Sequence, residues 1–186
     1  MIARAAASPA IPQRHQPVIR AETLVLRPIE LRDEPLLALH AGDLRVAAGT
    51  RSIAHPLPRG AARAFIEAAQ APGRDEDVWA IDGSAQGAPD LLGVVSLKSL
   101  DRNQSQIGYW VAPAFWHGGI ASAAVRALLA ANPHGNRTLF AEVFQDNPVS
   151  ARLLTHAGFD YIGDAEAFSL ARGAAVPTWT YLRKMG

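Results

Sequence analysis

The clearest pattern of apolar and polar positions lies in the middle of the chain, over residues 107–131. Ile107, Tyr109 and Val111 alternate with their neighbours at a period of two, which predicts a strand. Pro113 should end that strand, because proline has no N–H to give to a β-ladder. A helix to about residue 131 is predicted next from apolar residues at helical spacing, namely Ile120, Ala121, Ala124, Val125, Leu128 and Leu129.

Two adjacent glycines, Gly118 and Gly119, lie in the loop between this strand and this helix. The first turn of a helix has free N–H groups and a positive dipole end, and glycines let a ligand approach the backbone closely. The stretch could therefore hold a phosphate group. It could equally be a plain turn, since its spacing matches neither the Walker loop nor the dinucleotide-binding fingerprint.

The rest of the chain predicts an α/β protein with a mixed sheet flanked by helices. Asn147 suits a helix N-cap, Pro148 the first helical position, and Gly158 the residue after the helix end. The predicted helices cover residues 33–40, 59–70 and 148–157, and the predicted strands cover residues 23–28, 77–81, 91–100, 138–144, 159–162 and 177–184.

Composition narrows the class of protein. The length of 186 residues, without an internal repeat or linker, indicates one domain, placed at residues 21–186. Residues 1–20 are rich in alanine and proline, and we interpret them as a disordered tail. The net charge of +1 gives no field that would attract nucleic acid or a membrane, and no apolar run is long enough to span one.

The chain has no cysteine, which excludes disulfides, a cysteine nucleophile and thiolate metal sites, and which fits a cytoplasmic protein. None of its 6 histidines forms a metal-spaced pair, so no metal is expected.

Residues 108–122, GYWVAPAFWHGGIAS, resemble motif A of the GCN5-related N-acetyltransferases (GNAT), especially the Rim-type branch that acetylates ribosomal-protein N-termini. His117 departs from the pattern, because the family has a glycine there and a histidine with positive φ is uncommon. The matching residues are Gly108, Tyr109, Trp110, Val111, Pro113, Phe115, Trp116, Gly119, Ile120, Ala121 and Ser122.

Residues 140–163, FAEVFQDNPVSARLLTHAGFDYIG, resemble motif B of the same family, at the separation from motif A that the family has. The resemblance extends over about residues 21–184. The matching residues are Glu142, Val143, Asn147, Ser150, Leu154, Gly158, Phe159 and Gly163.

The resemblance implies the GNAT fold, with a predominantly antiparallel sheet whose two central strands splay apart around acetyl-CoA. The pantetheine arm would pair with backbone groups near Trp110 and Val111, and Asn147 could bond it or could serve only as the helix cap. The pyrophosphate would lie on the N–H groups of His117, Gly118, Gly119, Ile120, Ala121 and Ser122.

The same resemblance gives Ser150 the role of protonating the leaving thiolate, with support of the helix cap as the alternative. An acceptor ammonium must lose a proton before it can attack, and Glu142 or Glu166 could accept it directly, or a water chain could. Many relatives carry glutamate on the strand before motif A, where this chain has Ser105 and Gln106.

The expected function is direct acetyl transfer from acetyl-CoA to a primary amine, of a protein N-terminus or a small molecule. A non-catalytic coenzyme A-binding or regulatory module on the same fold is the alternative, and a nucleotide-binding protein is a further one. The sequence does not identify the acceptor amine or the length of the acyl group, and it leaves open whether the protein forms a homodimer.

Overall fold

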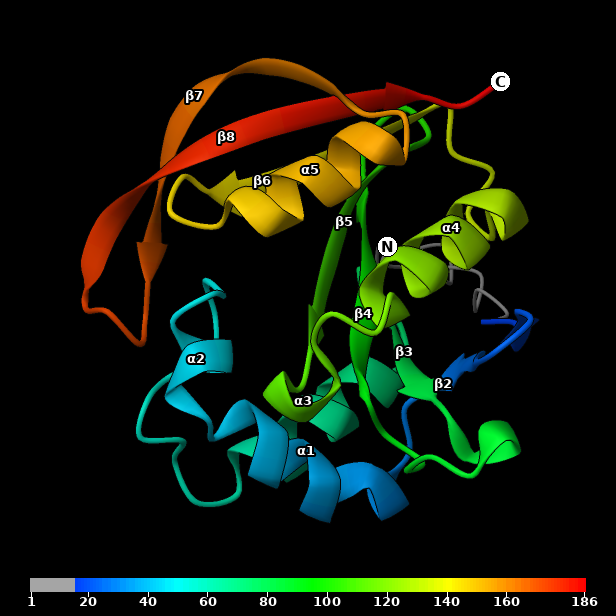
Figure 1. The fold of residues 1–186 in the computed structure, drawn as a ribbon, viewed down its shortest axis with the longest axis vertical. Coiled ribbons are helices and arrows are strands. Elements are labelled where there is room, and N and C mark those ends of the chain that lie inside the picture. Colours follow the sequence, from blue (N-terminus) through cyan, green and yellow to red (C-terminus); the bar gives the residue numbers. More distant parts are fainter. Residues whose placement is uncertain (1–15) are drawn as a thin grey trace, which may run out of the picture.

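The computed structural model describes residues 16–186 as an eight-stranded mixed sheet with helices on both faces (Figure 1). The strands are β1 (Ile19–Arg20), β2 (Val25–Pro28), β3 (Glu76–Asp82), β4 (Gly93–Leu100), β5 (Gln104–Val111), β6 (Thr138–Phe144), β7 (Asp160–Ser169) and β8 (Ala174–Lys184). The α-helices are α1 (Glu34–Ala41), α2 (Leu44–Ala47), α3 (Ala61–Gln70), α4 (Ile120–Ala131) and α5 (Pro148–His156). Short 3₁₀ turns lie at Leu31–Asp33, Ser84–Gln86 and Pro113–Phe115.

The strand order is β1-β2-β3-β4-β5-β6-β8-β7. Neighbouring strands pair antiparallel except for β5 and β6, which run parallel with α4 as their crossover. The prediction of a mixed, mainly antiparallel sheet flanked by helices is therefore confirmed. Within residues 16–186, no helix is long and apolar enough to cross a membrane.

The two faces of the sheet carry separate apolar cores. On one face, α4 and α5 pack against β5 and β6 through residues such as Val125, Leu154 and Val143. On the other, α1 and α3 pack against β3 and β4 through residues such as Ile66 and Val94. Because side chains alternate along a strand, neighbouring residues of the central strands belong to different cores.

A buried arginine ties the first strands together. Arg27 on β2 binds both carboxylate oxygens of Asp33 at 2.8 Å and one oxygen of Asp82 at 2.7 Å, and it donates to the carbonyl of Asp90 at 3.0 Å. The hydrogen bond with Asp33 is the main cause that raises the pKa of Arg27. The guanidinium thus joins β2, the turn before α1, β3 and the β3–β4 loop.

The structure corrects the sequence predictions at both ends of the chain. Ile19–Arg20 pair with β2, and the side chain of Gln16 donates to the carbonyl of Val78, so residues 16–20 belong to the fold and not to a tail. Residues 1–15 of the predicted tail lie outside the described residues.

Near the other end, the strands expected at 159–162 and 177–184 are longer, because β7 and β8 form a long antiparallel hairpin with a register shift between Tyr161 and Gly163. The exposed edge strand β7 lacks a clean apolar alternation, which explains why the pattern underestimated it.

We expect Arg27→Met to lower the free energy of unfolding by about 3–5 kcal/mol, because it leaves two buried carboxylates without their cationic partner. Arg32→Met is the control, since Arg32 pairs with Glu30 at the surface and its loss should cost at most about 1 kcal/mol. Urea denaturation of both variants measures the difference; equal losses would contradict the role assigned to Arg27.

Candidate functional site

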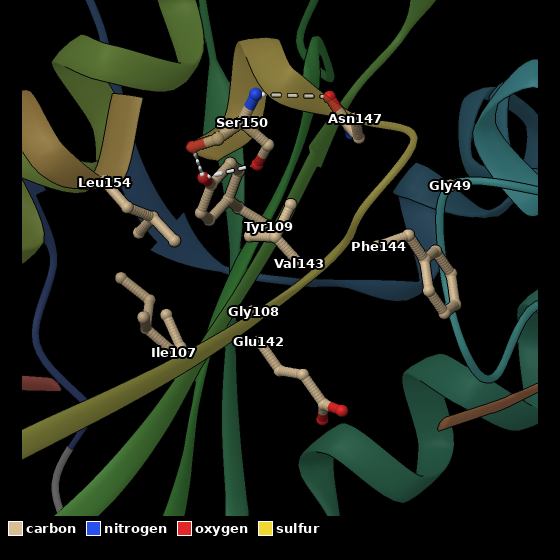
Figure 2. Close-up of a pocket in the computed structure, with 11 residues that line it drawn as sticks. Gly49, Ile107, Gly108, Tyr109, Glu142, Val143, Phe144, Asn147, Ser150 and Leu154 are labelled. Carbon is tan, nitrogen blue, oxygen red and sulfur yellow. Dashed lines mark hydrogen bonds between the residues drawn. The ribbon is translucent and has the colours of Figure 1, made fainter. Parts of the chain in front are cut away.

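The site begins where β5 and β6 separate. The strands pair only from Gln104 with Thr138 to Ile107 with Ala141, and then each continues without pairing to the other among the described residues. The pocket at this divergence is lined by Gly49, Ile107, Gly108, Tyr109, Ala141, Glu142, Val143, Phe144, Asn147, Ser150 and Leu154 (Figure 2).

Strand geometry decides which backbone groups of β5 face the gap. The N–H of Ala112 donates to Leu92, and a Cβ added to Gly93 would lie 2.2 Å from the carbonyl oxygen of Trp110. The backbone groups of Trp110 therefore face β4, and by alternation those of Tyr109 and Val111 face the gap. The carbonyl of Val111 already accepts the indole N–H of Trp116 at 2.7 Å.

The loop after β5 ends in an open helix N-terminus. Gly119 is the N-cap of α4 with φ +74°, and no side chain among residues 16–186 caps the helix. The N–H groups of the first turn are left without intrahelical partners by helix geometry. His117 has φ +65°, the left-handed conformation that a glycine would adopt freely. His117, Gly118 and Gly119 are all exposed.

The first turn of α5 places a serine hydroxyl at the gap. Asn147 caps the helix, with its side-chain oxygen accepting the N–H of Ser150 at 3.1 Å. The hydroxyl of Ser150 does not serve this cap; it lies 2.7 Å from the phenol oxygen of Tyr109 on β5 (Figure 2). The cap interpretation of Asn147 is confirmed, and the hydroxyl of Ser150 is free of that task.

Tyr109 is a polar group of the site that the sequence identified as a strand residue and a motif A match, without a role in the chemistry. Burial raises the pKa of its phenol to about 12, so the group stays protonated at neutral pH. It can therefore donate a proton to Ser150, or accept one from it, within a single hydrogen bond.

Glu142 reaches the same gap from the opposite face of the sheet. It precedes Val143, which packs in the core under α5, and its side chain points away from Ser150 (Figure 2). One carboxylate oxygen accepts the hydroxyl of Thr178 at 2.8 Å, and the other pairs with Arg51 at 2.7 Å. The carboxylate is thus held on the face that carries α1 and α3.

Other polar candidates lie away from the pocket. Glu166 is exposed on the edge strand β7 and does not line it. Ser105, His134 and Asp77 are aligned like a hydrolytic triad, with contacts of 3.2 and 2.8 Å. Ser105 is only 1% exposed and its hydroxyl donates to Asn136, so we interpret this network as structural.

The structure brings the motif B residues Glu142, Asn147 and Ser150 together in one pocket. The motif A loop and the N-terminus of α4 do not line this pocket; they follow the end of β5. Sequence reasoning missed Arg51 and Thr178, which are distant in sequence from Glu142 and belong to no motif. Among the residues that the structure describes, no group of three His, Asp or Glu side chains could hold a metal ion.

Comparison with known proteins places this geometry in a family. The family described as the acetyltransferase (GNAT) domain matches residues 23–160. No curated protein sequence matches the chain significantly. Many solved structures are similar to this chain.

One of them, RimL, a ribosomal-protein α-N-acetyltransferase in complex with coenzyme A, is 18% identical with a TM-score of 0.77, over 91% of this chain and 98% of that one. A GNAT-family acetyltransferase from Bacillus anthracis is 18% identical with a TM-score of 0.75, over 90% and 98%. A spermidine N-acetyltransferase from Vibrio cholerae, with coenzyme A and spermine, is 14% identical with a TM-score of 0.74, over 88% and 96%.

At these identities the structures establish the fold alone, whereas the family match covers most of the chain. The family match agrees with two features of the structure. These are the diverging central strands and the open N-terminus of α4. The chain belongs to the acetyltransferase (GNAT) domain family.

Proposed function

We propose that this protein is an acetyl-CoA-dependent N-acetyltransferase that transfers the acetyl group directly to a primary amine. The observation that carries the proposal is the gap between β5 and β6, which has Ser150 at one face and Glu142 at the other. A donor and an acceptor could meet there from opposite sides of the sheet.

The donor side fits acetyl-CoA. The backbone groups of Tyr109 and Val111 that face the gap would pair with the amides of the pantetheine arm, as an added strand would. The free N–H groups at the start of α4, from Ile120 to Ser122, would bind the pyrophosphate. Two of the similar structures hold coenzyme A, which supports this choice of donor.

The proposed reaction has one bond-forming and one bond-breaking step. The neutral amine nitrogen attacks the thioester carbonyl, and its excess proton passes to Glu142 or through water to solvent. A backbone N–H near Val111 would stabilise the oxyanion. When the C–S bond breaks, the sulfur takes a proton from the hydroxyl of Ser150, which Tyr109 orients, and water returns a proton to Ser150 once coenzyme A has left.

The acceptor is a protein N-terminus or a small amine. RimL and the spermidine enzyme represent these two classes, and both have the fold of this chain. On the acceptor side, Glu142 offers a carboxylate to a cationic amine, and this is the feature of the site that favours an ammonium-bearing acceptor.

The test is thiol release from acetyl-CoA across a panel of amines that includes ribosomal-protein N-terminal peptides and polyamines, beside calorimetry with acetyl-CoA in EDTA. We expect one acetyl-CoA site and turnover with at least one amine class. Binding without turnover would favour the non-catalytic module, and absence of both would overturn the proposal.

Gly119→Val should weaken acetyl-CoA binding at least about tenfold, because the side chain would stand where the pyrophosphate meets the start of α4 and the residue has φ +74°. Gly60→Val is the matched control, since Gly60 is also an N-cap with φ +77° and open space around its Cβ. Calorimetry should find weakened binding in the first variant alone; a similar loss in both would assign the effect to backbone strain.

Ser150→Ala should lower kcat by about 10²–10⁴ while leaving acetyl-CoA affinity nearly unchanged, since positioned proton transfer contributes in that range. Thr155→Ala is the control, because Thr155 lies on the same helix and its hydroxyl donates only to the carbonyl of Ala151. Turnover and urea denaturation are measured on both. Unchanged kcat in Ser150→Ala would remove this residue from the proposed mechanism.

A further inference from the structure

The carboxylate on the acceptor side is already paired with a cation. Arg51 donates to Glu142 at 2.7 Å. The two residues are far apart in the sequence, and folding brings the segment of Arg51 beside β6. Gly49, two residues earlier, lines the pocket itself. The guanidinium thus contacts a residue that lines the pocket, at the one oxygen of Glu142 that Thr178 does not hold.

The two partners differ in how firmly they are held. The Glu142 side chain is 15% exposed, belongs to a central strand and is fixed through Thr178, whereas the Arg51 side chain is 55% exposed. An exposed ion pair contributes little to stability, because water solvates the arginine well and the long side chain gains freedom on leaving. A competing cation would therefore displace Arg51 and leave Glu142 in place.

The backbone beneath Arg51 stays fixed when the side chain moves. The N–H of Leu170 donates to the carbonyl of Arg51 at 3.0 Å, and the hydroxyl of Ser169 donates to the carbonyl of Thr50 at 3.2 Å. The β7–β8 hairpin thus holds the segment, and only the arginine side chain has to swing for the carboxylate to become free.

We propose that Arg51 occupies the acceptor's ammonium subsite on Glu142, and that an acceptor binds by replacing the guanidinium with its own ammonium group. This inference rests on the proposed function. It assigns the subsite to cationic primary amines. Arg51 is then a competitor that lowers acceptor affinity, and it is not a residue that binds the acceptor.

Arg51→Gln tests the competition. With an amine that the panel identifies as an acceptor, its KM should fall about two- to fivefold, which corresponds to the loss of a weak exposed ion pair, while kcat changes little. Arg51→Lys keeps the charge and should resemble the wild type. Arg63→Gln is the matched control, because Arg63 pairs with Glu34 at the same distance of 2.7 Å and is equally exposed at 55%.

A binding measurement makes the test independent of turnover. Butylamine, as its ammonium ion, is titrated by NMR into the enzyme saturated with coenzyme A, beside the neutral N-butylacetamide. Butylammonium should bind Arg51→Gln more tightly than the wild type, and the Arg51→Gln/Glu142→Gln double variant should lose this gain. The neutral amide should not distinguish the three proteins.

Two results would overturn the inference. The first is a higher acceptor KM in Arg51→Gln, which would mean that the guanidinium binds the acceptor, for instance through a carboxylate of the acceptor. The second is unchanged affinity for both the acceptor and butylammonium, which would mean that Arg51 does not compete. Failure of the proposed function is distinct: acetyl-CoA binding and thiol release would then be absent from the wild type as well, whatever butylammonium does.

Discussion

The short parallel ladder between β5 and β6 is the constraint on which the site depends. Four residue pairs, from Gln104 with Thr138 to Ile107 with Ala141, join the strands before they separate. Beyond that point the gap-facing N–H and C=O groups of β5 pair with no strand within residues 16–186, although the carbonyl of Val111 accepts the indole N–H of Trp116. The fold thus provides a slot through the middle of the sheet that an extended ligand can complete.

The slot connects two environments with different chemistry. On the face of α4 and α5, Tyr109 and Ser150 form a neutral hydroxyl pair, and burial keeps the phenol protonated. On the face of α1 and α3, Glu142 provides a charge that accepts a hydrogen bond from Thr178 and pairs with Arg51. Strand alternation on β6 separates these groups, so proton donation and proton acceptance need not compete for one position.

Burial and access distinguish this site from the other polar cluster of the sheet. Ser105, His134 and Asp77 have contacts that would suit hydrolysis, yet Ser105 is sealed in the interior and donates to Asn136. This buried polar network links β5, β3 and the loop before β6 at the joined end of β5 and β6. The function that we propose lies at the open end, where Ser150 remains partly exposed.

Local sequence determined the elements whose signals are local: the helix start at Asn147 and Pro148, the end of β5 at Pro113, and the motif spacing that indicated the family. These depend on capping, proline geometry and periodicity within a few residues. The length of the edge strand β7 was underestimated because little of its surface is buried. Only the tertiary structure decided that Tyr109 meets Ser150, and that Arg51 and Thr178 reach Glu142, because residues so far apart in the chain become neighbours only through sheet pairing and packing.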